Sequence, residues 1–283
     1  MPEHWRFDAI GTRWDIETAQ PLETPVRDAV SALIAAFDAT WSRFRPDSVV
    51  SRLAASGGAV PVPVDAPAML EVYRELAAAT DGAVNPLVGE TLARRGYDAQ
   101  YSFVDGGAIP APAAAGIGWD ADHLRVATGA LIDVGALGKG RLVDLVLAEI
   151  APRVAGTVVV DASGDLAVRG GPVRVGLEHP YDPTRAIGVF AVTDAALCAS
   201  ATNRRAWGDG LHHVLDARTG EPVRRIAATW ALAPDAMHAD AAATALFFDG
   251  GPRLAAEWGV AWVRMTTDGR VEWSPEGKAE LFL

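Results

Sequence analysis

The order of hydrophobic and polar residues predicts a chain in which helices and strands are mixed. Apolar residues recur at helical spacing in some stretches and alternate or form short runs in others. The expected helices cover 24–37, 65–79, 85–92, the stretch from the turn at 135–140 to about 150, and 237–248, with a short one after Ser48. The expected strands lie at 5–18, 117–120, 123–127, 130–133, 158–168 (two strands bent at Ser163-Gly164), 173–177, 187–193, 195–200, the start of 211–222, and 226–233, with a short helix and two strands in the tail. Since these elements do not alternate as βαβ units, we predict the α+β class, with mixed, largely antiparallel sheets packed with helices.

Local sequence signals predict where several helices begin and end. Thr24-Pro25 has the form of a cap followed by proline at the first helical position, and Arg45-Pro46 ends the helix that follows. Ser48 and Asp65 are expected to cap the next two helices. Residues 98–115 have the composition of an exposed loop. No linker or internal repeat is visible, so we expect one domain over residues 1–283.

Composition and charge exclude several classes of function. The 283 residues are half hydrophobic and carry a net charge of −11 without any basic block, which argues against a nucleic-acid partner. Cys198 is the only cysteine, so neither an internal disulfide nor a cysteine-based zinc site is expected. No segment has the roughly 18 apolar residues of a membrane span, and the N-terminus lacks the apolar region of a signal peptide. A cytoplasmic protein is expected, although a precursor trimmed of its signal peptide would look the same.

The stretch from Leu131 to Asp144, LIDVGALGKGRLVD, is the first candidate for chemistry. An apolar run ends at Asp133, a glycine-rich turn carries Lys139, and a helical pattern follows. Such a turn brings free N–H groups and a lysine to one place and favours phosphate binding. The spacing matches neither a Walker A loop nor G-x-G-x-x-G. A tight turn with a solvated lysine fits the pattern equally well.

Asp240 and Thr244 form a second candidate, because residues at i and i+4 project from one face of a helix. A carboxylate beside a hydroxyl suits a hard cation such as Mg²⁺. The alternative is an aspartate that complements the helix dipole and a threonine that bonds back to a backbone carbonyl.

Other polar residues leave more than one interpretation open. His212 and His213 are adjacent, so at most one faces a given site, where it could accept a proton; a structural histidine is the alternative. Turn chemistry accounts for Asp161 and Asp165. We expect Arg43 and Arg45 either to meet anions or to be solvated, and Cys198 to be a buried apolar residue rather than a nucleophile. No arrangement compels a hydrolase triad.

Seven segments, spread over nearly the whole chain, together carry a family resemblance. They are the turn at Ile10–Thr12, SRFRPDS at 42–48, TDGAVNPLVG at 80–89, DVGALGKG at 133–140, DASGD at 161–165, HHVLDARTG at 212–220 and ADAAATALF at 239–247. In this order they resemble the ApbE family of FAD:protein FMN transferases. No single motif is decisive, but seven in the same order make coincidence very improbable.

The resemblance implies an ApbE-like fold and a specific reaction. Such enzymes bind FAD, hold Mg²⁺ against its pyrophosphate and transfer FMN to a threonine or serine hydroxyl of an acceptor flavoprotein, releasing AMP. A two-lobed domain with FAD between the lobes would satisfy this expectation. The residues that match family positions are Asp240, Thr244 and the carbonyl of Ala136 for the metal; Ile10, Gly11, Thr12, Ala83, Val84, Asn85, Asp133, Lys139 and Val214 for the flavin nucleotide; and His213, Lys139 and Asp240 for catalysis, with His213 as general base.

The chain departs from the family pattern at five positions, four of them in these segments and the fifth at Ala201 in a TSG-like segment. Ile10 replaces methionine, Asn85 aspartate, Ser163 and Ala201 glycine, and Ala217 proline. The added side chains at Ser163 and Ala201 put the shape of the pocket in question. Two rival functions therefore accompany the transferase: an FAD pyrophosphatase that yields FMN and AMP, and a non-catalytic FAD-binding protein.

Overall fold

An eight-stranded antiparallel sheet runs through the centre of the computed structural model, which describes residues 2–275, 277 and 279–282. Its strand order is β1-β2-β6-β7-β10-β15-β16-β17. The strands are β1 (Glu3–Ala9), β2 (Thr12–Thr18), β6 (Val158–Asp161), β7 (Asp165–Arg169), β10 (Ala195–Ala201), β15 (Ile226–Ala233), β16 (Ala261–Thr266) and β17 (Val271–Trp273). The four central strands, β6, β7, β10 and β15, are rich in valine, alanine and leucine, because both faces of the sheet are covered there.

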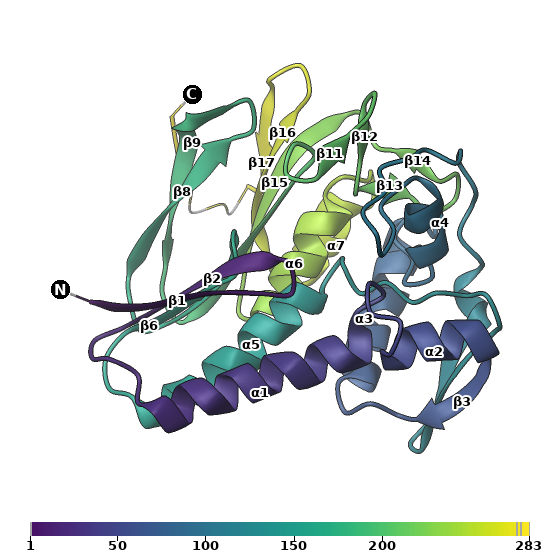
Figure 1. Cartoon of the computed structure of the whole chain (residues 1–283). Helices are drawn as coiled ribbons and strands as arrows, with labels where there is room; N and C mark the ends of the chain where they lie inside the picture. Colours follow the sequence, from purple (N-terminus) through teal and green to yellow (C-terminus); the bar gives the residue numbers. More distant parts are fainter. Residues whose placement is uncertain (1, 276, 278, 283) are drawn as a thin grey trace.

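Helices cover one face of this sheet. They are α1 (Thr24–Trp41), α5 (Gly138–Ile150) and α6 (Ala236–Ala245). In Figure 1, α1 runs along the bottom of the view with α5 above it, and α6 lies between α5 and the sheet strands. Helix α6 carries six alanines among its ten residues, which lets it pack closely between α5 and strands β10 and β15.

A second, smaller sheet covers the other face, with the order β18-β9-β8. Its strands are β8 (Val173–His179), β9 (Asp182–Val192) and β18 (Glu280–Leu281). Leu177 and Phe190 from this sheet are fully buried in one cluster with Leu166 and Trp230 from the large sheet.

The other elements complete the fold, most of them at one end of the layers, to the right in Figure 1. They are α2 (Val49–Ser56), β3 (Gly58–Pro61), α3 (Ala66–Ala79), α4 (Gly89–Arg94), η1 (Ala114–Gly116), β4 (Ile117–Trp119), β5 (His123–Val126), η2 (Ala151–Arg153), β11 (Ala206–Trp207), β12 (Leu211–His212), β13 (Leu215–Asp216), β14 (Glu221–Pro222) and α7 (Gly251–Glu257). None of the helices in the described part of the chain is both long and apolar enough to cross a membrane.

The predicted fold class is confirmed, and most of the predicted elements are present. Helices α1, α3, α5 and α6 and the strand pair around Ser163-Gly164 lie where the pattern placed them, within a few residues. Ser48 caps α2, because its side chain accepts a hydrogen bond from the N–H of Ser51. Residues 98–113 form no helix or strand.

Two predicted strands are wrong. Residues 5–18 form a hairpin rather than one strand, since Ile10 and Gly11 both adopt positive φ angles and turn the chain between β1 and β2. Residues 130–133 form no strand; their backbone bonds to the segment at 86–89 instead, through the N–H of Asp133 and the carbonyl of Leu131.

The ends of several other helices and strands differ from the predicted ends. In these places a side chain contacts a distant residue, or the chain forms a turn. Neither Thr24 nor Asp65 caps a helix through its side chain, and Asp65 binds Arg141 of α5 instead. Helix α4 begins at Gly89, not Asn85, and α6 ends at Ala245, not Phe248. The stretch 211–222 contains two-residue strands only.

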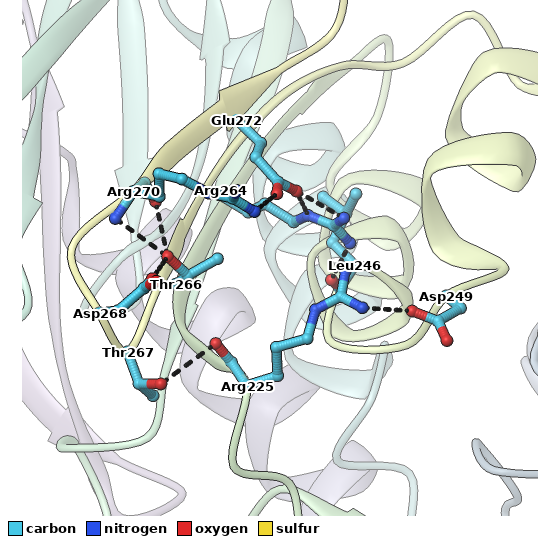
Figure 2. Close-up of polar contacts among 9 residues, drawn as sticks. All are labelled: Arg225, Leu246, Asp249, Arg264, Thr266, Thr267, Asp268, Arg270 and Glu272. Carbon is cyan, nitrogen blue, oxygen red and sulfur yellow. Dashed lines mark hydrogen bonds and ion pairs between the residues drawn. The ribbon is translucent and has the colours of Figure 1, made fainter.

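A polar network fixes the C-terminal end of α6 (Figure 2). The side chain of Arg264, which is 8% exposed, pairs with Glu272 and donates a 3.1 Å hydrogen bond to the carbonyl of Leu246. Arg225 pairs with Asp249 on the turn after the same helix. Because the last carbonyls of a helix lack partners within it, the Arg264 contact satisfies one of them and anchors α6.

Candidate functional site

A cavity of about 1330 Å³ lies between the glycine turn, the hairpin of β1 and β2, and strand β8. It is larger than the roughly 300–1,000 Å³ typical of small-molecule sites. Every residue that the sequence analysis assigned to a site lines it: Ile10, Gly11, Thr12, Ala83, Val84, Asn85, Asp133, Ala136, Lys139, His213, Val214, Asp240 and Thr244. The structure therefore gathers all of the predicted positions, which are spread over most of the chain, around one space.

The contact between α5 and α6 positions Asp240. Gly140 lies against α6 so closely that a Cβ at this position would meet the carbonyl of Ala236 and lie 2.8 Å from Cβ of Asp240. The N–H of Gly140 consequently reaches Oδ2 of Asp240 at 2.9 Å. Burial, together with the charge of Asp165, raises the pKa of Asp240 well above its ordinary value.

Thr244 lies one turn further along α6 and faces the glycine turn. Its Oγ1 is 3.3 Å from the backbone carbonyl oxygen of Ala136. The structural alternative for this pair is wrong: Asp240 is in the middle of α6, and the hydroxyl bonds to a distant carbonyl rather than to its own helix. Three oxygen groups, from Asp240, Thr244 and Ala136, thus line the cavity between α6 and the turn.

Lys139 is held by a carboxylate. Its Nζ lies 2.9 Å from Oδ2 of Asp165, whose side chain is 1% exposed. Burial alone would lower the pKa of Lys139, but the charges of Asp165 and Asp240 raise it, so the ammonium form is stable. The interpretation of a solvated lysine is therefore wrong, and turn chemistry does not explain Asp165. It does explain Asp161, which accepts a 2.9 Å hydrogen bond from the N–H of Gly164.

Asp133 is locked in place by two neighbours. Arg43, whose side chain is 2% exposed, pairs with its carboxylate, and the hydroxyl of Tyr73 donates to its backbone carbonyl at 3.0 Å. Arg43 is therefore buried against a protein carboxylate and is not solvated. Arg45, by contrast, is partly exposed and pairs with Asp38 and Asp47.

The two adjacent histidines divide as their alternation predicted. His212 is buried, and its Nε2 lies 2.9 Å from the carbonyl oxygen of Val223, so its role is structural. His213 lines the cavity, and its buried Nδ1 has no hydrogen-bond partner among the described residues. Desolvation, followed by the charge of Arg205, lowers the pKa of His213 to about 3. Its imidazole is therefore neutral at pH 7.

Departures from the family pattern have local explanations at two positions. Asn85 donates from Nδ2 to the carbonyl of Pro112 at 2.8 Å, which an ionised aspartate could not do. The N–H of Ala217 donates to the carbonyl of Ala83 at 3.0 Å, and proline has no such N–H. Both substitutions therefore add hydrogen bonds that hold the cavity wall.

The remaining departures alter the surface of the cavity. Ile10 adopts a φ of 48°, an unusual conformation for a β-branched residue, at the tip of the hairpin. Ser163 also has a positive φ, and its hydroxyl donates to the carbonyl of Arg13. Ala201 lies at the end of β10 in the cavity wall. None of the three closes the cavity.

A cluster of aromatic side chains was not predicted from the sequence. This aromatic wall consists of Phe44, Tyr97, Tyr101, Phe103 and Trp207. Phe44 and Tyr101 stack with ring centres 5.2 Å apart, and Tyr97 stacks on Trp207 at 5.5 Å. Phe103 adjoins Trp207, and the side chains of Tyr101 and Phe103 come from the loop that the sequence marks only as exposed. The available signal was the concentration of aromatic residues at 97–103.

Comparison with known proteins identifies the family to which a chain with this site belongs. Residues 10–263 match the ApbE family. The chain belongs to this family. It is 29% identical over 300 residues to the FAD:protein FMN transferase of Rhodobacter capsulatus, and 28% identical over 263 residues to that of Treponema pallidum (strain Nichols). The first alignment covers 97% of this chain and 57% of the relative; the second covers 79% and 71%. The chain thus spans little more than half the length of the first relative.

Solved structures share the fold. The flavin transferase ApbE from Vibrio cholerae superimposes with a TM-score of 0.83 at 19% identity, covering 98% of both chains. The ApbE protein from Thermotoga maritima gives 0.84 at 23% identity, covering 97% of both. The predicted ApbE-like fold is confirmed, and the predicted enzyme class, a transferase, agrees with the names of the two curated relatives.

Proposed function

We propose that this ApbE family member is an FAD:protein FMN transferase that depends on Mg²⁺. It would move FMN from FAD to a threonine or serine hydroxyl of an acceptor flavoprotein and release AMP. The observation that carries the proposal is the meeting of Asp240, Thr244 and the carbonyl of Ala136 beside Lys139 in one large cavity. We take residues 1–283 as one flavin transferase domain.

The oxygen groups on α6 and the glycine turn fit Mg²⁺. The donor set is a buried carboxylate, a hydroxyl and a backbone carbonyl, all of them hard oxygen ligands. Burial and the charge of Asp165 raise the pKa of Asp240, and a bound cation would offset both effects. When bound, Mg²⁺ would neutralise charge on the phosphate oxygens of FAD.

Different residues of this chain would have different roles in phosphoryl transfer. The acceptor oxygen attacks the FMN phosphorus, and the P–O bond to AMP breaks. His213, neutral at pH 7, would accept the proton of the attacking hydroxyl. Lys139, kept as an ammonium ion by Asp165, would stabilise the negative charge of the phosphate oxygens.

The walls of the cavity would bind the rest of FAD. The hairpin tip at Ile10, Gly11 and Thr12, the segment at 83–85 and Val214 supply mostly apolar surface. Asp133 offers polar groups held rigid by Arg43 and Tyr73. Rigid support of this kind lowers the entropy lost when a ligand binds.

The test is incubation of the protein with FAD and Mg²⁺, with and without EDTA, and with a threonine-containing acceptor protein. The transferase predicts flavin bound covalently to the acceptor in equal amount to the AMP released, both lost in Asp240→Asn. Release of FMN and AMP without labelled acceptor would instead indicate an FAD pyrophosphatase. Bound, intact FAD under every condition would contradict both and indicate a flavin-binding protein.

A further inference from the structure

Most of the charged side chains that line the cavity form ion pairs. Four arginines belong to the lining: Arg43, Arg45, Arg204 and Arg205. The first pairs with Asp133, the second with Asp38 and Asp47, and Arg204 with Glu178 at 2.9 Å. In the part of the chain that the structure describes, no carboxylate lies within ion-pair distance of Arg205, and its guanidinium donates no hydrogen bond.

Arg205 lies close to the groups proposed for catalysis. Its backbone carbonyl accepts a 3.2 Å hydrogen bond from the N–H of His213, which fixes its place in the wall. Its Cζ lies 5.9 Å from the ring centre of Tyr97. Its charge contributes, after desolvation, to the low pKa of His213. The guanidinium is thus an exposed cation at the cavity, near Tyr97 and close enough to His213 for its charge to affect the imidazole.

We propose that Arg205 binds the diphosphate of the dinucleotide substrate, an inference that rests on the proposed function. A planar guanidinium presents paired donors that match two phosphate oxygens, and a charge-assisted contact of this kind is stronger than a neutral one. Among the described residues neither Arg205 nor Asp240 has an ion-pair partner, although Asp240 accepts a hydrogen bond from the N–H of Gly140. The cation and the carboxylate together complement a metal-bound diphosphate, which is negative at its oxygens and positive at its metal.

The other arginines of the lining cannot take this role without breaking a pair. Arg43 would leave the buried carboxylate of Asp133 uncompensated, which is costly. Arg204 and Arg205 are neighbours in the same loop and both exposed, so they share backbone and solvent environment. They differ in that Arg204 already has Glu178 as its partner, and Arg204 is therefore a matched control.

The test measures binding of three probes in EDTA: FAD, ADP and riboflavin. FAD and ADP carry a diphosphate, whereas riboflavin carries no phosphate. We expect Arg205→Gln to weaken binding of FAD and ADP by about 10-fold or more, with riboflavin unchanged. Arg205→Lys should recover part of the loss, because it keeps the charge but not the paired donors. Arg204→Gln should match the wild type with all three.

Two results would overturn the inference. One is equal affinity of Arg205→Gln and Arg204→Gln for ADP. The other is an equal loss for riboflavin and FAD in Arg205→Gln, which would indicate a damaged wall rather than a lost phosphate contact. If the wild type binds ADP and shows the Arg205 dependence but transfers no FMN, the proposed function fails and the diphosphate site stands. If the wild type transfers FMN and Arg205→Gln binds normally, only the inference fails.

Discussion

The backbone N–H of Gly140 donates a 2.9 Å hydrogen bond to the carboxylate of Asp240, across the contact between α5 and α6. Two motifs far apart in the chain, the glycine turn and the alanine-rich helix, are joined at this point. The contact requires that the helices approach closely, and only glycine leaves the necessary space at position 140. The site therefore depends on packing as much as on its polar residues.

Gly140→Ala should separate the two helices. The added methyl group would meet the carbonyl of Ala236, which is backbone and cannot rotate away. We expect the free energy of unfolding to fall by about 1–3 kcal/mol or more, measured by urea denaturation. Gly118→Ala is the control, since no heavy atom lies within 4 Å of its new Cβ. Equal stabilities of the two variants would contradict the packing argument.

Thr244 allows a test of the metal site with little change in shape. Thr244→Val removes the hydroxyl that lies 3.3 Å from the Ala136 carbonyl, whereas Thr244→Ser keeps it. If the hydroxyl is a ligand, the valine variant should bind Mg²⁺ about 10-fold or more weakly, and millimolar Mg²⁺ should raise its melting temperature less. The serine variant should respond as the wild type does. Identical Mg²⁺ titrations of all three proteins by calorimetry would exclude Thr244 as a ligand.

Patterns within about ten residues of each other predicted much of the fold. Helical periodicity located α1, α3, α5 and α6. The spacing of Asp240 and Thr244 correctly predicted that both side chains lie at the same cavity. The hairpin at Ile10 was missed, because a β-branched residue with a positive φ is contrary to local preference. Strain of this kind concentrates at functional sites, where sequence-based prediction is weakest.

Contacts between distant residues could not be predicted. The pairs Lys139–Asp165, Arg141–Asp65 and Arg43–Asp133 each decide how a charged residue behaves, and each joins different segments of the chain. No periodicity encodes such partners. The family resemblance supplied what local pattern lacked, since it named residues from seven segments that the fold then gathered around one cavity.

Asn85→Asp tests whether the departure at this position is structural. The amide of Asn85 is buried and donates to the Pro112 carbonyl, so an ionised aspartate would leave that carbonyl without its donor. We expect a loss of about 1–3 kcal/mol in the free energy of unfolding at pH 7. The loss should shrink at low pH, where a protonated carboxyl can donate. Asp81→Asn, at a side chain that is 97% exposed, is the control and should be nearly neutral. A stable Asn85→Asp protein would show that the amide donor is dispensable.

The N-terminus of α6 should make stability depend on pH. Asp235 caps the helix through the N–H of His238 and also binds the ring of His238, and this hydrogen bond raises the pKa of His238. The charges of Glu75 and Asp144 act in the same direction. Because the folded pKa is higher than the unfolded one, the contribution is complete below pH 6.5 and is lost as the pH rises through the folded pKa.

His238→Gln should therefore destabilise the protein more at pH 5.5 than at pH 9. Both partners are more than a third exposed, so solvent screening limits the pH-dependent difference to about 0.2–1 kcal/mol. Asp235→Ala should cost a further ~1 kcal/mol at every pH, since it also removes the cap. Urea denaturation of the three proteins across this pH range measures both effects. A difference that grows toward pH 9 would contradict the ion pair.

His213 should show the opposite dependence on pH. Desolvation and the charge of Arg205 lower its pKa to about 3, so the unfolded chain takes up a proton below pH 6.5 that the folded chain does not. Stability is therefore lost as the pH falls from about 6.5 toward 3, and His213→Gln should lose less of it over this range. NMR of the histidine ring, assigned with the same variant, should show no titration of His213 between pH 8 and pH 5. A midpoint near 6.5 would mean that the imidazole is solvated, and it would make His213 a group whose protonation controls transfer near neutral pH. The expected result instead leaves a neutral base across that range, so any fall in the transfer rate between pH 8 and pH 5 would have to come from another group.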